Sequence, residues 1–588
     1  MKNWSLACVA TTVGLVSASG VAGQVGRVSV YEIPETPPGV NGPYTFGGLD
    51  SLRVNNGGRL VFGATLRREN AQDRYGVFVM GGGVPLTNVL DTNTDTVAAE
   101  FGTDGVAGIT RSYIIRDDNT LRLNASLDTP FPAADGIDST NADLEWSGAG
   151  RPVVSVRRTA DIFVPGNVVS SWHGTFFSPD ETEGWVFNGS TTFSSESLWP
   201  IEPDGTLGAL FMQHLGPAST NGGDLPGRPN ASIRFPDFPT VGDSGSVAFR
   251  ARLRTNAGDP ETSITFFGRK GEGYGPLFDP RETATEFLGA FPGYRVSGAL
   301  PLGITDSDAV RVYATFINDG TNISDGHGIW SFRDDGLPGT LLLQVGRTAP
   351  GLEPGERIRF PLQSATTTRS VAMIEGSHMR VLSTAQDASG EQRYVEYNIA
   401  PDDTVTPVFF STDTFEIPGA SGGPFVITSI SDRDIRWTDD GRLVAQGSIE
   451  DTTDSTNRAS AILYVDDTGT VRTLAVTGQM FDFGSSPTGG QRVVQSVDLG
   501  EVSSGGKVVF GVRPVGGSNE PFRYAVADIN APLCPADTNG DGAISPADFT
   551  AWVIAFNGQT AACDQNGDGL CTPADFTAFI LGYNAGCP

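Results

Sequence analysis

Short apolar runs separated by turn-rich stretches fill the chain from Gln24 to about Asn530. Apolar residues alternate with polar ones or follow one another for a few positions, which is the pattern of β-strands. The clearest runs are GRLVFGATL (58–66), GSVAFRARL (245–253), AVRVYATF (309–316), RSVAMIEG (369–376), GRLVAQGSI (441–449) and GKVVFGVRP (506–514). This part of the chain is therefore predicted to be mainly β.

These runs resemble one another, because each begins at a turn residue and continues with two or three β-formers. Successive copies begin about 60–70 residues apart, with one gap about three times as long. The copies begin at Gly58, Gly245, Asp308, Arg369, Gly441 and Gly506. The long gap has room for two degenerate copies, near Thr120 and Gly174, so the pattern predicts about seven or eight units.

A second strand pair follows within each unit, as strand, Gly/Asp turn and strand. The clearest hairpins are YGVFVMGGGVPLTNVL (75–90), HGIWSFRDDGLPGTLLLQV (327–345) and SAILYVDDTGTVRTLAV (460–476). Repeated units of about four strands predict a β-propeller, whose blades cannot bury their faces alone. A string of β-sandwiches, at about 100 residues per unit, and a β-solenoid are the alternatives.

Composition agrees with a fold of short strands and tight turns. The 588 residues include 75 glycines and 38 prolines, and 18% are charged. The formal net charge is −29, and Lys2, Lys270 and Lys507 are the only lysines. A chain with this much negative charge is not attracted to phosphate backbones or anionic lipid. Nucleic-acid partners are therefore excluded.

The first 23 residues have the layout of a secretory signal peptide. MKNW supplies one positive charge, and an apolar, small-residue stretch follows that ends in Val21-Ala22-Gly23. The alternative is an N-terminal core helix. No later apolar run is long enough to cross a bilayer, so no membrane insertion is expected. The mature protein is predicted to be secreted or to lie at the cell surface.

Four of the runs carry a common short motif. Residues 55–62 read NNGGRLVF and residues 242–249 read GDSGSVAF, while Ser503–Phe510 and Thr438–Ala445 are weaker copies. The motif resembles the NxxGxxAF tandem-repeat family of exported bacterial proteins, which carry interchangeable C-terminal anchors. The resemblance implies a repeat architecture and brings no catalytic residues.

Two further segments, DTNGDGAISPAD (537–548) and DQNGDGLCTPAD (564–575), agree at eight of twelve positions. Both fit the EF-hand register, which places oxygen ligands at positions 1, 3, 5, 7, 9 and 12 and a glycine at position 6. Flexible spacing of six or seven oxygens suits Ca²⁺ better than Mg²⁺, so two calcium sites are predicted. The predicted ligands are Asp537, Asn539, Asp541, the carbonyl of Ala543, Ser545 and Asp548, and Asp564, Asn566, Asp568, the carbonyl of Leu570, Thr572 and Asp575.

A helix is predicted after each loop. Apolar residues recur at i, i+3, i+4 and i+7, and Ser545-Pro546 and Thr572-Pro573 supply an N-cap and a proline at the first helical position. The two stripes are Phe549, Trp552, Val553 and Phe556, and Phe576, Phe579, Ile580 and Tyr583. The alternative is two capped helices after polar turns, without metal.

Because no helix enters the loops, the duplicated loop-plus-helix resembles type I dockerins, the calcium modules that bind cohesin-bearing scaffolds. The resemblance covers about 50 of the 588 residues and implies a cohesin-like partner. Pro546-Ala547 and Pro573-Ala574 stand at positions 10 and 11, where dockerins commonly carry Ser or Thr. Attachment to another protein of the bacterial surface therefore stays open beside cohesin docking.

Four cysteines, Cys534, Cys563, Cys571 and Cys587, lie in this last segment. An even number in a short exported region predicts two disulfides, with three pairings possible. Zinc would need CxxC or Cys/His spacing, which is absent. Cys571 occupies loop position 8, where it is either bridged or simply buried.

Two features of the sequence bear on enzymatic activity. GASGGP (419–424) resembles the nucleophile loop of chymotrypsin-like serine proteases, but Ser421 would need a histidine base, and His173, His214, His327 and His378 lack the expected context. Glycoside hydrolysis needs two carboxylates at a set separation, and the sequence, with 68 acidic residues, selects no pair.

Three domains are therefore predicted: a signal peptide (1–23), a propeller-like β-repeat domain (24–530) and a small α-helical, dockerin-like paired EF-hand domain (531–588). The leading hypothesis is a non-catalytic exported binding protein with calcium-dependent attachment and no assigned catalytic residue. The alternatives are a polysaccharide-degrading glycoside hydrolase with a dockerin-like tail, and a serine hydrolase using Ser421.

Overall fold

The structure is a computed structural model of the chain. It describes residues 16–17, 27–31, 33–34, 36–40, 42–69, 72–81, 84–92, 96–99, 102–128, 139–148, 154–158, 163–164, 167–171, 174–177, 184–188, 190–191, 196–201, 212–214, 224–225, 228–242, 244–254, 262–278, 287, 293–321, 324–333, 338–359, 370–374, 377–417, 423–466, 469–483, 491–516, 523–530, 536, 538, 544, 546–558, 563, 565 and 571–585.

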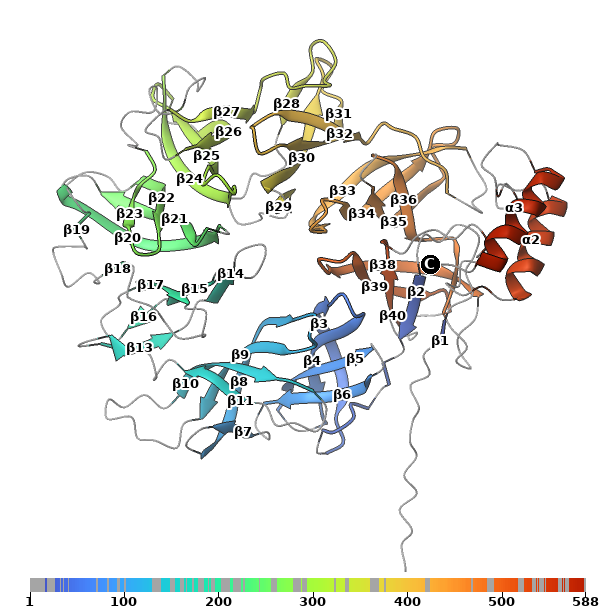
Figure 1. The fold of residues 1–588 in the computed structure, drawn as a ribbon, viewed down its shortest axis with the longest axis horizontal. Helices are drawn as coiled ribbons and strands as arrows, with labels where there is room; N and C mark the ends of the chain where they lie inside the picture. Colours follow the sequence, from blue (N-terminus) through green and yellow to red (C-terminus); the bar gives the residue numbers. More distant parts are fainter. Residues whose placement is uncertain are drawn as a thin grey trace, which may run out of the picture.

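Groups of antiparallel strands follow one another around a ring in chain order (Figure 1). The first group shows the plan, because its four strands pair strictly in sequence order: β3 (Thr45–Val54), β4 (Arg59–Arg67), β5 (Arg74–Gly81) and β6 (Val84–Asp91). In this group, as in that of β24 to β27 (residues 294–344), the first strand lies toward the middle of the ring and later strands lie farther out (Figure 1). This radial arrangement of sheets is a β-propeller, so the predicted fold class is confirmed.

The next strands continue the ring. A small closed barrel is formed by β7 (Thr96–Ala99), β8 (Gly102–Ile115), β9 (Leu121–Asp128), β10 (Ser139–Trp146) and β11 (Val154–Arg158). Two smaller sheets follow, one of β12 (Phe163–Val164), β13 (Asn167–Ser171) and β16 (Ser190–Thr191), the other of β14 (Gly174–Phe177), β15 (Gly184–Asn188), β17 (Glu196–Ile201) and β18 (Met212–His214).

Four more blades complete most of the circle. The first two share one sheet, because Ser263 of one pairs in parallel with Gly298 of the other. The first consists of β19 (Asp224–Leu225), β20 (Arg228–Val241), β21 (Ser246–Arg254), β22 (Thr262–Arg269) and β23 (Gly273–Pro276). The second consists of β24 (Tyr294–Ile304), β25 (Val310–Asn318), β26 (Ser324–Phe332) and β27 (Thr340–Gln344). The others are β28 (Arg357–Arg359), β29 (Val371–Ile374), β30 (His378–Gln386), β31 (Gln392–Ile399) and β32 (Val405–Phe410), and β33 (Phe425–Trp437), β34 (Leu443–Asp451), β35 (Arg458–Val465) and β36 (Val471–Val476). The three hairpins predicted from sequence are β5–β6, β26–β27 and β35–β36, and all three are present.

The last blade joins the two ends of the body. Its strands β38 (Gln491–Val502), β39 (Lys507–Pro514) and β40 (Arg523–Asp528) continue into β2 (Arg27–Tyr31), which pairs antiparallel with β40 from Arg27↔Asp528 to Tyr31↔Tyr524. The short strands β37 (Met480–Asp482) and β1 (Val16–Ser17) extend this sheet at its edges. Main-chain hydrogen bonds between distant segments therefore close the ring.

The first two strands of a blade meet in one kind of five-residue turn. In residues 55–59 the N–H of Asn55 donates to the carbonyl of Arg59, and the N–H of Gly58 donates to the carbonyl of Asn55. The same pair of bonds closes the turns 116–120, 242–246, 305–309, 438–442 and 503–507. The fourth residue of each has a positive φ, for example 73° at Gly58 and 59° at Asp308. Glycine, asparagine and aspartate adopt this conformation at the least cost, which explains the glycine at the start of most copies.

One predicted copy is placed wrongly. The run 369–376 contains β29, a first strand, and the buried second strand β30 begins only at His378. The turn residue here is Ser377, with φ 61°, whose hydroxyl accepts the N–H of Asp306 at 2.6 Å. The left-handed position of this turn is thus held by a serine that contacts the preceding blade, and the glycine of the run, Gly376, stands one residue earlier. The copy near Thr120 is confirmed as β9, whereas β14, at Gly174, stands at the end of its sheet.

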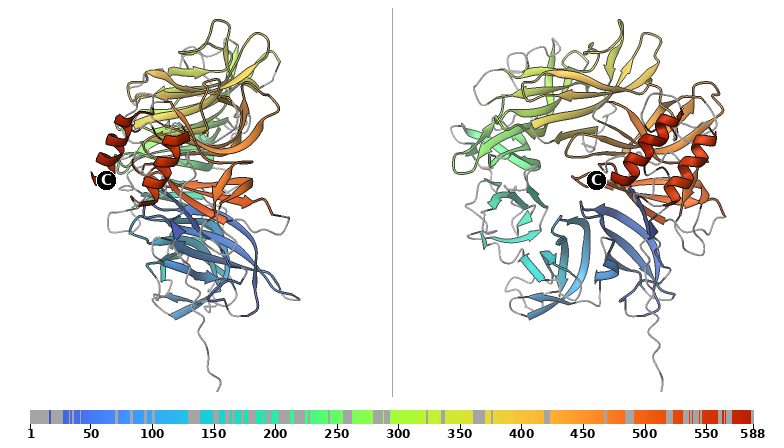
Figure 2. Two further views of the ribbon diagram at one scale, coloured as in Figure 1. Left: turned by 90° about the vertical axis from the view of Figure 1, so that its right-hand side faces the viewer. Right: turned by 45° about the vertical axis from the view of Figure 1, so that its right-hand side comes forward.

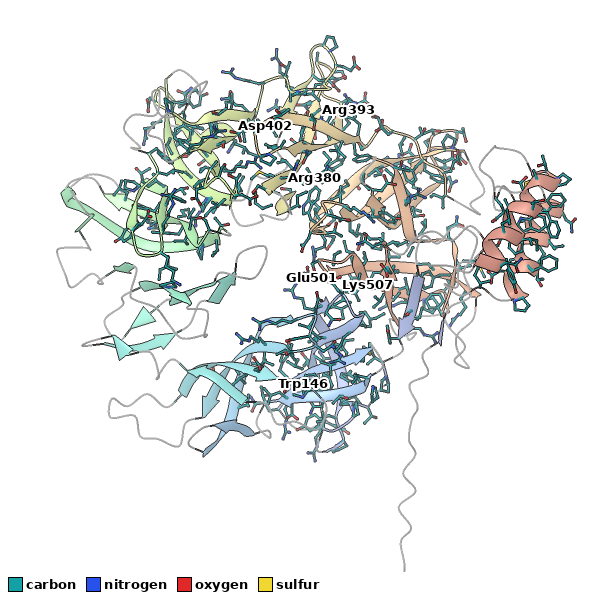
Figure 3. The ribbon with its side chains drawn as sticks, viewed as in Figure 1. Trp146, Arg380, Arg393, Asp402, Glu501 and Lys507 are labelled. Carbon is teal, nitrogen blue, oxygen red and sulfur yellow. A yellow bond between two sulfur atoms is a disulfide. The ribbon has the colours of Figure 1, made fainter. Side chains whose placement is uncertain are left out.

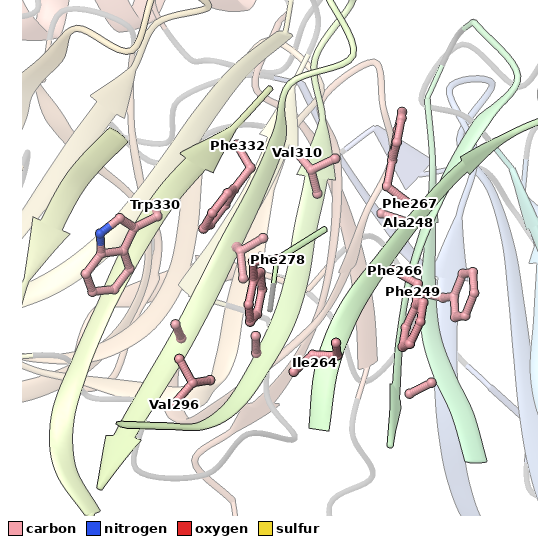
Figure 4. Close-up of a cluster of buried hydrophobic side chains, with 14 of the residues drawn as sticks. Ala248, Phe249, Ile264, Phe266, Phe267, Phe278, Val296, Val310, Trp330 and Phe332 are labelled. Atoms are coloured by element: carbon pink, nitrogen blue, oxygen red, sulfur yellow. The ribbon is translucent and has the colours of Figure 1, made fainter. Parts of the chain in front are cut away.

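In the blades whose side chains the structure describes, the second strand is buried along most of its length, because both faces of a blade pack against neighbouring sheets. In β30 all residues from Met379 to Ala385 are buried. Figure 4 shows one such core, in which aromatic rings of two neighbouring blades cluster. Phe249 stacks on Phe266 with ring centroids 5.4 Å apart, and Phe287 meets Trp330 edge-on at 5.3 Å.

The turns also bond to one another from blade to blade. The Nδ2 group of Asn55 donates to the carbonyl of Arg116 at 2.8 Å in the next blade, and Ser244 Oγ donates to Asp308 Oδ1 at 2.6 Å. At the closing seam Asn56 donates through Nδ2 to Ser504 Oγ at 2.9 Å and accepts the N–H of Gly505. The turn that begins the ring is thus bonded to the turn that ends it.

Two helices follow the ring, α2 (Pro546–Gly558) and α3 (Pro573–Ala585). They lie outside the circle of sheets, beside the last blades (Figures 1 and 2). Among the described residues, no helix is long and apolar enough to cross a membrane.

We predict that Asn56→Ala weakens ring closure, because it removes the hydrogen bonds to both neighbouring turns, Ser504–Gly505 on one side and Asp117 on the other. Each such bond contributes about 1 kcal/mol, so the free energy of unfolding should fall by roughly 2–3 kcal/mol in urea titrations. The control is Asp402→Ala, which removes a carboxylate that caps its own turn at the Thr404 N–H. Equal losses in the two variants would contradict a role for Asn56 in closure.

Candidate functional site

The two C-terminal helices begin in the same way and pack on each other. Both start at the sequence PADF, and Thr572 caps α3 by accepting the N–H of Ala574 at 3.3 Å. Between the helices Trp552 stacks on Phe579 with centroids 5.4 Å apart, and both side chains are buried. These two residues occupy equivalent places, four positions after Asp548 and Asp575. The last three residues of each predicted stripe therefore form the core of this unit, which also includes Ala536.

The first residue of each stripe differs from the expectation. Phe549 and Phe576 are 43% and 42% exposed, and their rings contact each other at 6.4 Å between centroids. Their side chains thus lie at the border of the small core instead of inside it.

Asp548 and Asp575, the predicted ligands at position 12, are both completely buried. Asp575 is held by three donors: the N–H of Gln565 reaches Oδ1 at 2.9 Å, and the N–H and hydroxyl of Thr572 reach Oδ2 at 2.7 and 3.1 Å. The Thr572–Asp575 pair is a capping box. A buried carboxylate destabilises the fold unless hydrogen bonds or a cation compensate for the lost water. The burial of Asp548 and Asp575 therefore points to a structural requirement at these two positions.

The surroundings of Asp575 fit a calcium loop. Its bond to the N–H of Gln565 brings position 2 of the loop against position 12. EF-hand loops require this return of the loop start to its end. Of the predicted ligands the structure describes Asp548, Thr572 and Asp575; Asp537, Asn539, Asp541, Ala543, Ser545, Asp564, Asn566, Asp568 and Leu570 lie outside the described residues.

A disulfide joins Cys563 to Cys571, with Cα atoms 5.6 Å apart. One of the predicted bridges is therefore present, and Cys571 at loop position 8 is bridged. Cys534 and Cys587 lie outside the described residues, so their pairing stays a prediction. The buried Cys563 also accepts, through its carbonyl, the indole N–H of Trp552 at 3.3 Å.

Only the end of the serine-protease-like loop lies in the part of the chain that the structure describes. Ser421 lies outside the described residues, but the adjacent Gly423 N–H donates to Asp451 Oδ2 at 3.0 Å. Asp451 also accepts the N–H and hydroxyl of Thr453, and these hydrogen bonds lower its pKa to about 2. The carboxylate thus fixes Gly423, at the end of this loop, to the turn after β34.

The described histidine side chains are engaged in other blades. His327 Nδ1 lies 3.1 Å from Tyr313 Oη, and His378 Nδ1 lies 3.1 Å from Asn398 Oδ1. Both contacts lie within the sheets of β25–β26 and β30–β31, away from the blade of Gly423. The side chains of His173 and His214 are not described.

A charged cluster on the first strands of three blades was not predicted from sequence. Glu501 of β38 binds Arg436 of β33 and Arg53 of β3, each at 2.7 Å. Figure 3 shows Glu501 on the side of its sheet toward the middle of the ring. Nearby, desolvation and the charge of Asp434 raise the pKa of Asp498, while Arg436 lowers it. The irregular strands that carry these residues gave no periodic signal, because β33 and β38 both contain bulges.

A family model described as "Family of unknown function (DUF7453)" matches residues 28–363. No curated protein matches the chain. Similar solved structures include the β-propeller domain of the Trilobed protease from Pyrococcus furiosus, with 8% identity over 73% of this chain and 98% of that chain and a TM-score of 0.33. The acylaminoacyl peptidase of Pyrococcus horikoshii is 10% identical over 80% of this chain, with a TM-score of 0.33, and only 58% of its own length is covered.

A third similar structure is an exo-β-1,3-galactanase from Phanerochaete chrysosporium, with 8% identity over 87% of this chain and 99% of that chain and a TM-score of 0.22. At these identities and scores the likenesses carry no information about chemistry.

The buried pair of Glu396 and Arg380 makes stability depend on pH. Their atoms Oε1 and Nη1 are 3.2 Å apart, and Glu396 is 1% exposed. Burial raises the pKa of Glu396 to about 8 from its ordinary 4.5, although the charge of Arg380 opposes this. The folded protein thus holds a proton that the unfolded chain releases above about pH 4.5.

We therefore predict that stability from this site is complete below pH 4.5 and is lost as the pH rises through 8. Glu396→Gln, which imitates the protonated acid, should flatten this dependence in unfolding titrations between pH 5 and 9. Glu450→Gln, which changes a pair with the exposed Arg458, is the control and should keep the wild-type slope. An unchanged slope in Glu396→Gln would count against the assignment.

Proposed function

The chain belongs to the DUF7453 family, a family of unknown function, and we propose that it is a secreted or cell-surface, non-catalytic binding protein. In this proposal the propeller presents the binding surface, and the segment 531–588 is a dockerin-like, calcium-dependent attachment module.

The burial of Asp548 and Asp575 at equivalent places carries the proposal. Both stand at position 12 of a repeated loop, in the first turn of a helix, and Asp575 draws the loop start toward itself through Gln565. Bound calcium would supply positive charge to these carboxylates. Asp537, Asn539, Asp541, Ala543 and Ser545 would complete the first site, and Asp564, Asn566, Asp568, Leu570 and Thr572 the second.

The charge of the segment supports calcium as well. Residues 531–588 contain six aspartates and no other residue of the Asp, Glu, Lys, Arg or His types, and all six are predicted ligands. Two Ca²⁺ ions would change the formal charge from −6 to −2. Without cations, mutual repulsion of the loop carboxylates opposes the compact unit.

Export is supported by the signal-peptide pattern and by the disulfide, since disulfides persist in oxidising compartments. The partner of the module is proposed to be a cohesin-like or other protein of the bacterial surface. The NxxGxxAF resemblance of the body points the same way, toward an exported repeat protein with an exchangeable anchor.

Calorimetric titration of the mature full-length chain with CaCl₂ tests the proposal. We expect two binding events, and Asp548→Asn and Asp575→Asn should each remove one. Asp319→Asn, which changes an exposed pair with Arg295 in the propeller, should leave both. EDTA should raise hydrogen exchange in α2 and α3 while the propeller strands stay protected. Absence of calcium heat from the wild-type chain would end the proposal.

The cluster on the inner strands favours a second candidate, a polysaccharide-degrading glycoside hydrolase. Such enzymes need two carboxylates in different environments, and Asp498, with its raised pKa, and Asp434 form one interacting pair. Incubation of the chain with a panel of polysaccharides distinguishes the two candidates. Released sugars that disappear in Asp498→Asn would favour the enzyme, whereas binding without turnover would favour the binding protein.

A further inference from the structure

The disulfide encloses the ligand-bearing part of the second loop. Cys563 immediately precedes loop position 1 and Cys571 is position 8, so positions 1, 3, 5 and 7 all lie inside one covalent ring. The ends of this ring are held 5.6 Å apart between Cα atoms. A segment closed in this way has fewer conformations to lose when it wraps around an ion.

The first loop has no such constraint, although its sequence is otherwise nearly the same. Ala536 and Ile544 occupy the places of Cys563 and Cys571. Ala536 is buried in the core between the helices, and Ile544 packs against that core. Apolar contacts therefore anchor the first loop, whereas a covalent bond anchors the second.

A hydrogen bond connects this ring to the other half of the unit. Trp552, on the helix that follows the first loop, donates its indole N–H to the carbonyl of Cys563 at 3.3 Å. Trp552 is 4% exposed and also stacks on Phe579 of the second helix. The hydrogen bond from Trp552 thus attaches the covalent ring to the core that the two helices share.

We propose that the Cys563–Cys571 disulfide makes the second loop the tighter of the two calcium sites, so that calcium fills it first. This inference rests on the proposed calcium function. Binding energy is not spent on ordering a chain segment that is already closed, so the second site gains affinity through a smaller entropic cost. For a ring of this size we expect a difference in Kd of about ten- to a hundredfold.

The test is a two-site calorimetric titration with CaCl₂ of the mature full-length chain and of Cys563→Ala/Cys571→Ile. This variant gives the second loop the residue pair of the first. The wild-type chain should show two classes of site, and in the variant the tighter class should weaken about ten- to a hundredfold to match the other. Hydrogen exchange of Pro573–Ala585 verifies that α3 stays folded.

Cys534→Ala/Cys587→Ala is the matched control, because it removes the other two cysteines of the segment and keeps the ring. It should retain the wild-type difference between sites. Reduction of this variant with dithiothreitol converts the Cys563–Cys571 disulfide to two thiols while the reagent becomes a cyclic disulfide, and it should abolish the difference without any new side chain in the loop.

The possible outcomes separate the two proposals. Two sites of equal affinity in the wild-type chain, or a difference that survives both reduction and Cys563→Ala/Cys571→Ile, would overturn the inference and leave calcium binding intact. Absence of calcium heat from the wild-type chain would remove the proposed function and the inference together.

Discussion

The pairing of β2 with β40 is the interaction on which the architecture depends. Five residues near the beginning of the body complete a sheet that is built from its end. The turns repeat this closure with side chains, because Asn56 bonds to Ser504 and Gly505 on one side and to Asp117 on the other. Glu501 adds a third link through Arg53 and Arg436. Main-chain hydrogen bonds, side-chain hydrogen bonds of the turns and an ion pair therefore all join the first and last blades.

Much of the blade plan could be predicted from sequence, because the five-residue turn has a strict chemical requirement. Gly58, Gly245, Gly441 and Gly506 mark that turn where the backbone is left-handed, and the buried second strand follows directly. The same reasoning failed at Ser377, where a serine occupies the left-handed position that glycine holds in most other blades. The closure of the ring could not be predicted from the sequence pattern, because no local signal in residues 27–31 specifies β40 as their partner.

In the C-terminal unit, too, features set by neighbouring residues could be predicted from sequence, whereas contacts between distant residues could not. Position-specific chemistry identified Asp548 and Asp575, and the structure buries both at the helix starts. The choice among three cysteine pairings needed the fold, because only the fold brings Cys563 beside Cys571. The cluster around Glu501 needed it as well, since its members come from three blades. A ring closed at one seam and a small helical unit with its own disulfide and apolar core thus combine in one chain.

Hydrogen exchange of the mature chain tests the central claim, closure of the ring by its own N-terminal strand, most directly. If β2 is an integral strand of the last blade, the amides of 27–31 that bond to β40 should exchange as slowly as those of β39, and both should be released together in global unfolding. Rapid exchange of 27–31 while β39 stays protected would contradict the account, because the ring would then be open at the seam.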